Sequence, residues 1–268
     1  MNLVILFINR LSKILGTLTK GLAYVFHFFF KKKRFTIPFY SKPIFSSHQQ
    51  ARIPKIIWQT NYTNHVSLPV YVNYLFNRLM SLDWEYRYVS TEERLEYIRA
   101  NASKRFSDAF EQLTNGASQA DFWRLFVLNH QGGVYMDIDA HAVWPLSKMI
   151  AHEDKEVFIL NKEHFTNYFM ASSKNNSILE NALNLIVENI EQQNIGRGVY
   201  DLTGPSVLNT AIGETSVNYR NYKYTCIQGS FTNEYFQYID KPRGKWTHVK
   251  LDDLLSKKKD FQESNQLS

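Results

Sequence analysis

Cysteine is almost absent from this chain. Cys226 is the only one among 268 residues, so no internal disulfide can form and nothing in the composition indicates an oxidising compartment. Low-complexity segments and internal repeats are also missing. With 44% hydrophobic and 21% charged residues, the composition excludes a disordered, collagenous or solenoid chain and leaves one large or two small globular domains.

Acidic side chains are missing from residues 1–34, which carry seven Lys and Arg. The rest of the chain has 24 basic and 25 acidic side chains, so the formal net charge of +6 comes from this terminal segment alone. The body of the protein is therefore close to neutral, and we expect no nucleic-acid partner.

A long uninterrupted apolar run is lacking as well. Apolar residues recur with helical spacing in residues 1–34, but Arg10, Lys13 and Lys20 interrupt the ~20 apolar residues that a spanning helix needs. No small-residue cleavage site follows, which disfavours a signal peptide. We expect a basic amphipathic helix in the membrane interface, with residues 31–34 holding the protein peripherally on the cytoplasmic face of the inner (plasma) membrane. The alternative is a helix packed on the protein's own core.

The rest of the chain alternates strand and helix patterns. Residues 35–51 contain Pro and Ser without periodicity and are predicted to be a linker, and residues 257–268 a polar tail. Between them, strands are predicted at 53–58, 86–89, 134–139 and 155–160, and helices at 68–82, from 91 onward, at 117–130, 178–191 and 205–211. This order predicts an α/β domain over residues 52–256, with a mainly parallel twisted sheet flanked by helices.

The densest chemical pattern follows Gly132-Gly133. In a strand, side chains two positions apart share a face, so Tyr135, Asp137 and Asp139 are predicted to point one way and the apolar residues between them into the core. Paired carboxylates at the carboxyl end of a strand suit a hard cation such as Mg²⁺ or Mn²⁺. An EF-hand is excluded because Ala140-His141-Ala142 follows, and His141 also disfavours an aspartyl-phosphate phosphatase. Two exposed acids without a function remain an alternative.

Asp121 and Arg124 lie on one face of the preceding predicted helix. Taken alone, they favour a structural interpretation in which Ser118-x-x-Asp121 is a capping box and the two charges form an ordinary helical ion pair.

Combined with their neighbours, these residues resemble a known family. Ile-Pro-Lys-Ile-Ile-Trp-Gln at 53–59, Ala120-Asp121-x-x-Arg124 and Gly132-Gly133-x-Tyr135-x-Asp137-x-Asp139 are similar to the DXD-containing sugar transferases of glycosyltransferase family 32. That family includes initiating mannosyltransferases and bacterial capsule or lipooligosaccharide enzymes and is related to large glucosylating toxins. The resemblance is strongest over residues 53–146. Weaker similarities occur at Asn167, Thr203-Gly204-Pro205 and Trp246.

The resemblance implies a GT-A fold, a nucleotide-diphosphate sugar donor, a divalent cation (Mn²⁺ or Mg²⁺) and retention at the anomeric carbon. It implies that Asp139 ligates the metal and that Asp137 holds donor hydroxyls and reaches the metal through water. Asp121 and Arg124 would bind the donor sugar, through a carboxylate that accepts hydrogen bonds and a guanidinium that donates them.

Other residues receive roles by the same likeness. Trp58 occupies the position expected to stack on the base, with a core tryptophan as the alternative. Tyr135 would lie beside the donor. His248, after Trp246, is the candidate third metal ligand.

The expected function is therefore a membrane-peripheral hexosyltransferase that acts on a saccharide or lipid-linked saccharide acceptor in surface polysaccharide or lipooligosaccharide synthesis. A catalytically degenerate carbohydrate-binding protein on the same fold is one alternative. A metal-dependent phosphotransferase is another, disfavoured by His141 and by the lack of a glycine-rich phosphate loop with lysine.

Overall fold

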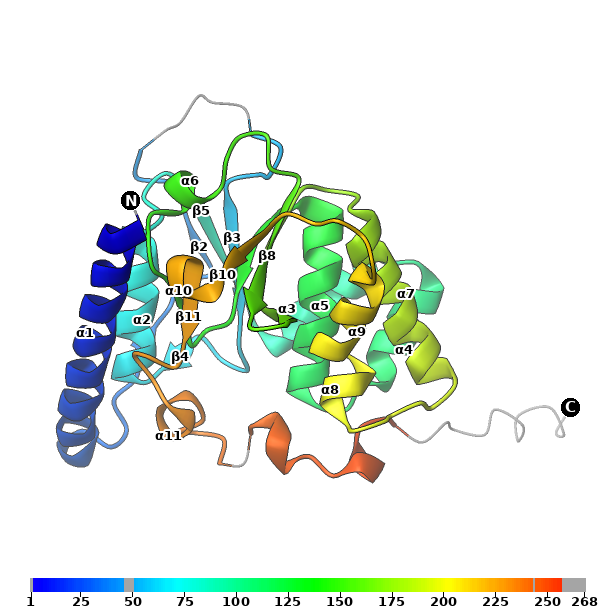
Figure 1. Ribbon diagram of the computed structural model, residues 1–268. Coiled ribbons are helices and arrows are strands. Elements are labelled where there is room, and N and C mark those ends of the chain that lie inside the picture. Colours follow the sequence, from blue (N-terminus) through cyan, green and yellow to red (C-terminus); the bar gives the residue numbers. More distant parts are fainter. Residues whose placement is uncertain (1, 46–50, 243, 257–268) are drawn as a thin grey trace, which may run out of the picture.

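The computed structural model describes residues 2–45, 51–242 and 244–256 (Figure 1). The predicted polar tail at 257–268 lies outside this range. The helices are α1 Asn2–Phe29, α2 Leu68–Leu79, α3 Thr91–Asn101, α4 Lys104–Gln112, α5 Gly116–Gln131, α6 Leu146–Met149, α7 Ser177–Glu191, α8 Val199–Leu202, α9 Pro205–Ile212, α10 Tyr222–Thr225 and α11 Glu234–Gln237, with short 3₁₀ turns at Trp246–His248 and Leu251–Asp253. The strands are β1 Phe35–Thr36, β2 Tyr40–Ser41, β3 Ile56–Thr60, β4 His65–Val66, β5 Glu85–Val89, β6 Gly133–Met136, β7 Ala140–Ala142, β8 Glu156–Asn161, β9 His164–Ser172, β10 Tyr219–Asn221 and β11 Cys226–Gln228.

A seven-stranded sheet in the order β10-β8-β9-β6-β3-β5-β2 forms the middle layer. Helices α1 and α2 lie on one side of it and α3, α5, α7 and α9 on the other, as Figure 1 shows. Separate apolar cores fill the two sides, one against α5 and α7 and one against α2. The α/β architecture predicted from the sequence is confirmed.

The sheet is mixed rather than mainly parallel, which corrects the expectation. Strands β3, β5 and β6 are parallel to one another, and β10 is parallel to β8. However, β9 runs antiparallel to both β8 and β6, and β2 antiparallel to β5. Strand β9 follows β8 through a short turn, and such a hairpin must be antiparallel.

The predicted linker at 35–51 contributes structure to two sheets. Its described part contains β1, which pairs with β4, and β2, which pairs with β5 at the edge of the main sheet. Ile37 between them is fully buried. The segment has no periodicity because each strand is only two residues long.

Helix α1 packs on the protein with its polar and small side chains. A stripe of buried residues, Ile5, Asn9, Ser12, Gly16, Ala23 and His27, faces the domain. Asn9 Nδ2 donates to Lys223 O (2.6 Å), and Ser12 Oγ lies 3.1 Å from His141 Nε2. The predicted helix is thus confirmed, and the alternative of packing on the protein itself holds for this face.

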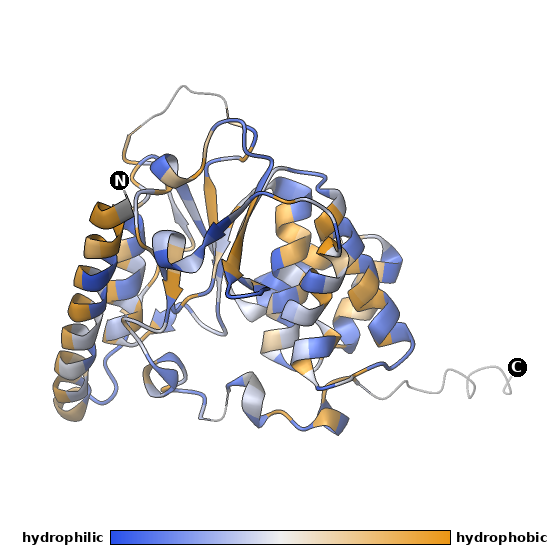
Figure 2. Cartoon of the chain, in the orientation of Figure 1, coloured by the Kyte–Doolittle hydropathy of each residue, from blue (hydrophilic) through white to orange (hydrophobic). Residues whose placement is uncertain are grey.

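The opposite face of α1 is apolar and exposed. Figure 2 shows apolar residues along the outer side of this helix, and Phe7, Leu18 and Leu22 are each more than half exposed. None of the helices in the described part of the chain combines the length and apolar composition needed to cross a bilayer.

Two glycines of α1 test its docking. A Cβ on Gly16 would lie 2.4 Å from Ser230 O, whereas a Cβ on Gly21 would meet nothing within 4 Å. Alanine stabilises a helix interior by ~0.5–1 kcal/mol relative to glycine. We therefore expect Gly21→Ala to raise the melting temperature slightly and Gly16→Ala to lower it. Equal effects of the two substitutions in thermal unfolding would contradict the docked position of α1.

Candidate active site

A cavity of about 780 Å³ opens at the carboxyl ends of β3 and β6. Its walls come from the segment after β3, the first turns of α3 and α5, the end of β6, the β8–β9 hairpin, the starts of α8 and α9, and residues within 228–241 and 244–245. The residues used below that line it are Thr91, Arg94, Gly116, Ala117, Asp121, Arg124, Tyr135, Asp137, Asp139, Asn167 and Gln228. Ligands of α/β sheets bind at this edge.

Two glycines direct the chain from α5 into β6. Gly132 ends α5 with φ +71°, and Gly133 follows with φ +112°. A Cβ on Gly133 would lie 2.6 Å from Ile56 O, so only glycine allows β6 to start this close to β3. Beyond the turn, Tyr135 and Asp137 share a face, because the Tyr135 hydroxyl donates to Asp137 Oδ1 (2.8 Å). The predicted shared face is confirmed for Tyr135 and Asp137, but β6 ends at Met136 and not at residue 139, and Asp139 follows in a turn.

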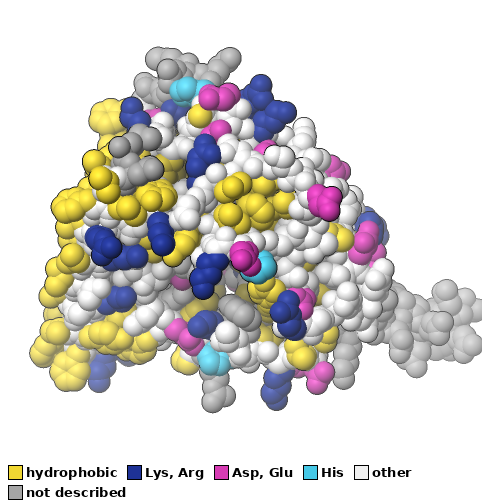
Figure 3. Space-filling model, viewed as in Figure 1, with side chains coloured by type: hydrophobic (Ala, Val, Ile, Leu, Met, Phe, Trp, Pro, Cys, Tyr) yellow, Lys and Arg dark blue, Asp and Glu magenta, His cyan; other side chains and the backbone are white. Residues whose placement is uncertain are grey.

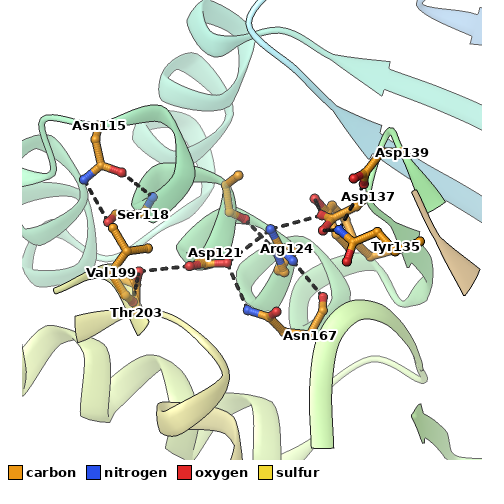
Figure 4. Close-up of polar contacts among 12 residues, drawn as sticks. Asn115, Ser118, Asp121, Arg124, Tyr135, Asp137, Asp139, Asn167, Val199 and Thr203 are labelled. Atoms are coloured by element: carbon orange, nitrogen blue, oxygen red, sulfur yellow. Dashed lines mark hydrogen bonds and ion pairs between the residues drawn. The ribbon is translucent and has the colours of Figure 1, made fainter. Parts of the chain in front are cut away.

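Arg124 is the centre of the polar network (Figure 4). Its Nη2 lies 3.1 Å from Asp121 Oδ1 and 3.2 Å from Asp137 Oδ1, and its side chain is only 7% exposed. Nη1 donates to Asn167 O (2.7 Å), and Cζ lies 4.5 Å from the centre of the Tyr135 ring. One buried guanidinium therefore fixes two carboxylates from separate elements.

Asp121 belongs to this network and not to a helix cap. Asn115 caps α5, because its Oδ1 accepts from the Ser118 amide (2.8 Å). Asp121 lies one turn further on, where it accepts from Asn167 Nδ2 (2.9 Å) and Thr203 Oγ1 (3.1 Å). The capping-box alternative is wrong, and Asn167 and Thr203, weak similarities in the sequence, lie at the site.

Asp137 and Asp139 converge on one point. The amide nitrogen Nε2 of Gln228 donates to Asp137 Oδ2 (3.1 Å) and to Asp139 Oδ1 (3.0 Å). Burial, followed by the charge of Asp137, raises the pKa of Asp139 to about 7. Burial also raises the pKa of Asp137, against the opposing charge of Arg124. The two carboxylates are thus held close together with too little positive charge between them.

This donor set fits a hard divalent cation. In the described residues, no group of three or more His, Cys, Asp and Glu could hold a metal. Two carboxylates that converge on a common point are nevertheless sufficient for Mg²⁺, which commonly takes one or two protein carboxylates and completes its shell with substrate phosphates and water. The side-chain amide of Gln228, whose nitrogen faces both carboxylates, also carries an oxygen of the kind that binds Mg²⁺.

His248 does not join these carboxylates, which corrects its predicted role as a metal ligand. It lies in the 3₁₀ turn Trp246–His248, where its Nε2 is 2.7 Å from Glu234 Oε1. It is also not among the residues that line the cavity. The Trp246 side chain is outside the described part of the structure.

Trp58 is a core residue and not a base platform, so this prediction is also corrected. It is 2% exposed, its Nε1 donates to Gly132 O (2.9 Å), and its ring packs edge-on against Trp123. Its side chain points away from the cavity because it occupies the α5 face of β3. The aromatic ring that the cavity does expose beyond β3 belongs to Tyr62, which stacks on Tyr238.

Gln228 is a site residue that no pattern in the sequence indicates. It lies about ninety residues after Asp139, on β11, and reaches the site because β11 pairs antiparallel with β7. Only the position of Asp139 directly before a second strand could have indicated a partner there.

The titration of Asp121 provides a test of its burial. Burial raises its pKa to about 7, despite the opposing charge of Arg124. An unfolded Asp titrates near ~3.9, so between pH ~4 and ~7 the folded protein binds more protons than the unfolded chain, and stability falls as the pH rises. Asp121→Asn removes this contribution.

We therefore expect the free energy of unfolding of Asp121→Asn to fall less steeply than that of the wild type over this range, as measured by denaturant titrations at several pH values. Asp137 and Asp139 are present in both proteins, so the difference between the two profiles reports what depends on Asp121, including its charge coupling to Asp137. Parallel pH profiles would show that Asp121 is ionised normally.

Part of this chain is similar in sequence to known proteins. Residues 69–156 match the family described as a glycosyltransferase sugar-binding region containing a DXD motif. Over 101 residues the chain is 33% identical to mannosyl phosphorylinositol ceramide synthase SUR1 of Saccharomyces cerevisiae, a match that covers 37% of this chain and 26% of that protein. The chain therefore spans about a quarter of the length of this curated relative.

Two solved structures show a more distant likeness. The PaToxG glycosyltransferase has a TM-score of 0.47 and 22% identity, over 60% of this chain and 69% of its own. The UDP-bound glycosyltransferase domain of the YGT toxin has a TM-score of 0.39 and 14% identity, over 55% and 54%. The matched region at 69–156 contains Asp121, Arg124, Asp137 and Asp139. Residues 69–156 therefore match the sugar-binding region of DXD-containing glycosyltransferases, and this match includes all four charged residues of the site.

Proposed function

We propose that this protein is a metal-dependent, retaining glycosyltransferase that moves a hexose from a nucleotide-diphosphate donor to a saccharide or lipid-linked saccharide. One observation carries the proposal: a cavity in which Arg124 joins Asp121 to Asp137, with Asp139 beside them. The match of residues 69–156 to the DXD-containing sugar-binding region supports the reaction class. The pathway, surface polysaccharide or lipooligosaccharide synthesis, rests on the sequence resemblance.

Asp121 and Arg124 are suited to the donor sugar. Both line the cavity, and their hydrogen bonds to Asn167 fix their orientation before any ligand binds. A carboxylate that accepts from hydroxyls beside a guanidinium that donates to them forms a polar floor for a hexose. Preorganised groups of this kind lower the barrier because they need no rearrangement during the reaction.

Asp137 and Asp139 would hold the cation, with the Gln228 amide beside them. When bound, a divalent cation supplies neutralisation of the negative charge that develops on the leaving diphosphate. Tyr135 keeps Asp137 in place through its hydroxyl, and Arg124 keeps it from the other side. In the overall transfer, the bond from the anomeric carbon to the diphosphate oxygen breaks, an acceptor hydroxyl oxygen forms the new bond, and its proton is released.

A screen of nucleotide sugars tests the reaction. We expect the wild type to hydrolyse at least one UDP- or GDP-sugar slowly without acceptor, only with Mn²⁺ or Mg²⁺ present. Asp139→Asn should lower this rate by about 10²-fold or more with an unchanged melting temperature. Asp108→Asn, at an exposed ion pair on α4, is the matched control and should keep full activity.

Other outcomes distinguish the alternatives. Donor binding without turnover for every nucleotide sugar would favour a carbohydrate-binding protein. Release of phosphate from simple esters would favour a phosphotransferase. Full activity in excess chelator would contradict the role of the carboxylate pair.

We further propose that α1 holds the enzyme at an anionic membrane surface, on the cytoplasmic side. The structure supports this by separating the two faces of the helix, since its polar stripe contacts the domain and its apolar side faces out. Exposed Arg10, Lys13 and Lys31 accompany the apolar side, and Figure 3 shows hydrophobic and basic side chains gathered along this edge of the molecule. Not all seven cations are available, because Arg34 pairs with Asp240 (2.6 Å) and Lys20 Nζ donates to Gly229 O (3.3 Å).

Vesicle flotation tests the membrane proposal. We expect the wild type to float with anionic vesicles and weakly with neutral ones, because each Lys or Arg near the surface contributes ~1 kcal/mol that salt screens. Changing Phe7, Leu18 and Leu22 together to Ser should abolish flotation without unfolding the protein, since all three are exposed.

The matched control changes Ile44, Tyr219 and Leu251, which are also exposed but lie outside α1. These three Ser substitutions should leave flotation unchanged. If neither the wild type nor the control variant floats, the proposed membrane role of α1 is wrong.

A further inference from the structure

The cavity contains a second buried guanidinium that the proposed donor contacts do not use. Arg94, on α3, lines the cavity and is 2% exposed. Its Nη2 donates to Thr91 Oγ1 (3.0 Å), but its Nε is buried without any hydrogen-bond partner among the described residues. No motif or spacing in the sequence distinguishes Arg94 from other arginines.

Comparison with Arg124 shows what Arg94 lacks. Both arginines are buried in the same cavity, and Arg124 has two carboxylates within 3.2 Å. No carboxylate in the described ranges forms an ion pair with Arg94. Its neighbour in sequence, Glu93, is used in the α3 cap, where its Oε2 accepts from the Ser90 amide (2.7 Å).

An unpaired buried charge is costly, because the low-dielectric interior does not replace its hydration. Burial accordingly disfavours the charged form and lowers the pKa of Arg94 to about 10. A buried cation of this kind is stabilised when an anion enters the cavity.

Two helix amino ends meet at Arg94. Thr91 begins α3 and Gly116 begins α5, and both residues line the cavity, as does Ala117. The Nη2 atom of Arg94 lies 4.0 Å from the position that a Cβ on Gly116 would take. Helix amino ends carry partial positive charge and unused amide donors, so they favour anions.

From these observations we propose that Arg94, with the amino ends of α3 and α5, is a phosphate subsite that binds the diphosphate of the donor nucleotide. The inference rests on the proposed function for its ligand but uses different residues. The carboxylate pair with its cation would neutralise one side of the diphosphate, and Arg94 would neutralise another. The lack of a side chain at Gly116 leaves room for phosphoryl oxygens beside the guanidinium.

Calorimetric titration of Arg94→Gln with UDP, GDP and inorganic pyrophosphate, each with Mg²⁺, tests this subsite. Because a hydrogen bond to a charged group contributes at least about tenfold in binding, we expect the variant to bind all three probes at least about tenfold more weakly than the wild type. Arg94→Lys keeps the charge and should recover part of the loss. Arg99→Gln, an exposed arginine of the same helix paired with Glu111, is the matched control and should bind normally.

Thermal unfolding separates ligand binding from a structural role. Without ligand, Arg94→Gln should unfold at the same temperature as the wild type or higher, since it removes an unpaired buried charge. The rise in melting temperature on adding pyrophosphate should be smaller in the variant. A large loss of stability without ligand, together with an unchanged pyrophosphate affinity, would overturn the proposal.

Comparing the affinities for UDP, GDP and pyrophosphate distinguishes a contact with the phosphates from a contact with the base. If Arg94→Gln weakens only UDP or only GDP and leaves pyrophosphate unaffected, Arg94 contacts the base and the phosphate assignment is wrong. If the wild type hydrolyses a nucleotide sugar while Arg94→Gln binds all probes normally, the subsite fails and the proposed function stands. If the wild type binds none of the probes and hydrolyses no donor, both fail.

Discussion

The buried contact of Arg124 with Asp121 and Asp137 is the constraint on which the site depends. Asp121 comes from α5 and Asp137 from the end of β6, and without the guanidinium these two carboxylates would repel each other in a poorly hydrated cavity. The same side chain packs over Tyr135 and donates to the backbone of β9. The Arg124 guanidinium therefore sets the relative positions of α5, β6 and β9. The Gly132-Gly133 turn connects α5 to β6.

The cavity combines paired and unpaired charges in a way that suits an anionic, polyhydroxylated ligand. Arg124 is fully compensated, whereas the carboxylates of Asp137 and Asp139 share one neutral amide, and Arg94 has no anion. A cation and a diphosphate entering together would offset both deficits. In this account the protein supplies an incomplete site, and the metal and the donor complete each other's coordination.

Local patterns were sufficient for the central part of the fold and of the site. Period-two alternation placed Tyr135 and Asp137 on one face, and helical spacing placed Asp121 beside Arg124.

Contacts between residues distant in sequence could not be predicted. The pairing of β11 with β7 brings Gln228 to Asp139, and the two-residue strands at 35–41 have no periodic signal. Trp58 and His248 were misassigned because residue type and order do not show which way a side chain points. For α1, amphipathicity predicted the helix but not that its polar stripe would face the protein.

The binding of Mn²⁺ with and without nucleoside diphosphate tests the central claim most directly. Electron paramagnetic resonance of free Mn²⁺ in solution with the full chain measures how much ion is bound. Two carboxylates alone should hold Mn²⁺ weakly. Adding UDP or GDP to the protein should raise the bound fraction of Mn²⁺ well beyond the fraction that the nucleotide binds by itself. This increase should be absent in Asp139→Asn. Mn²⁺ binding that does not respond to any nucleoside diphosphate, or that is the same in Asp139→Asn, would contradict a site completed jointly by cation and donor.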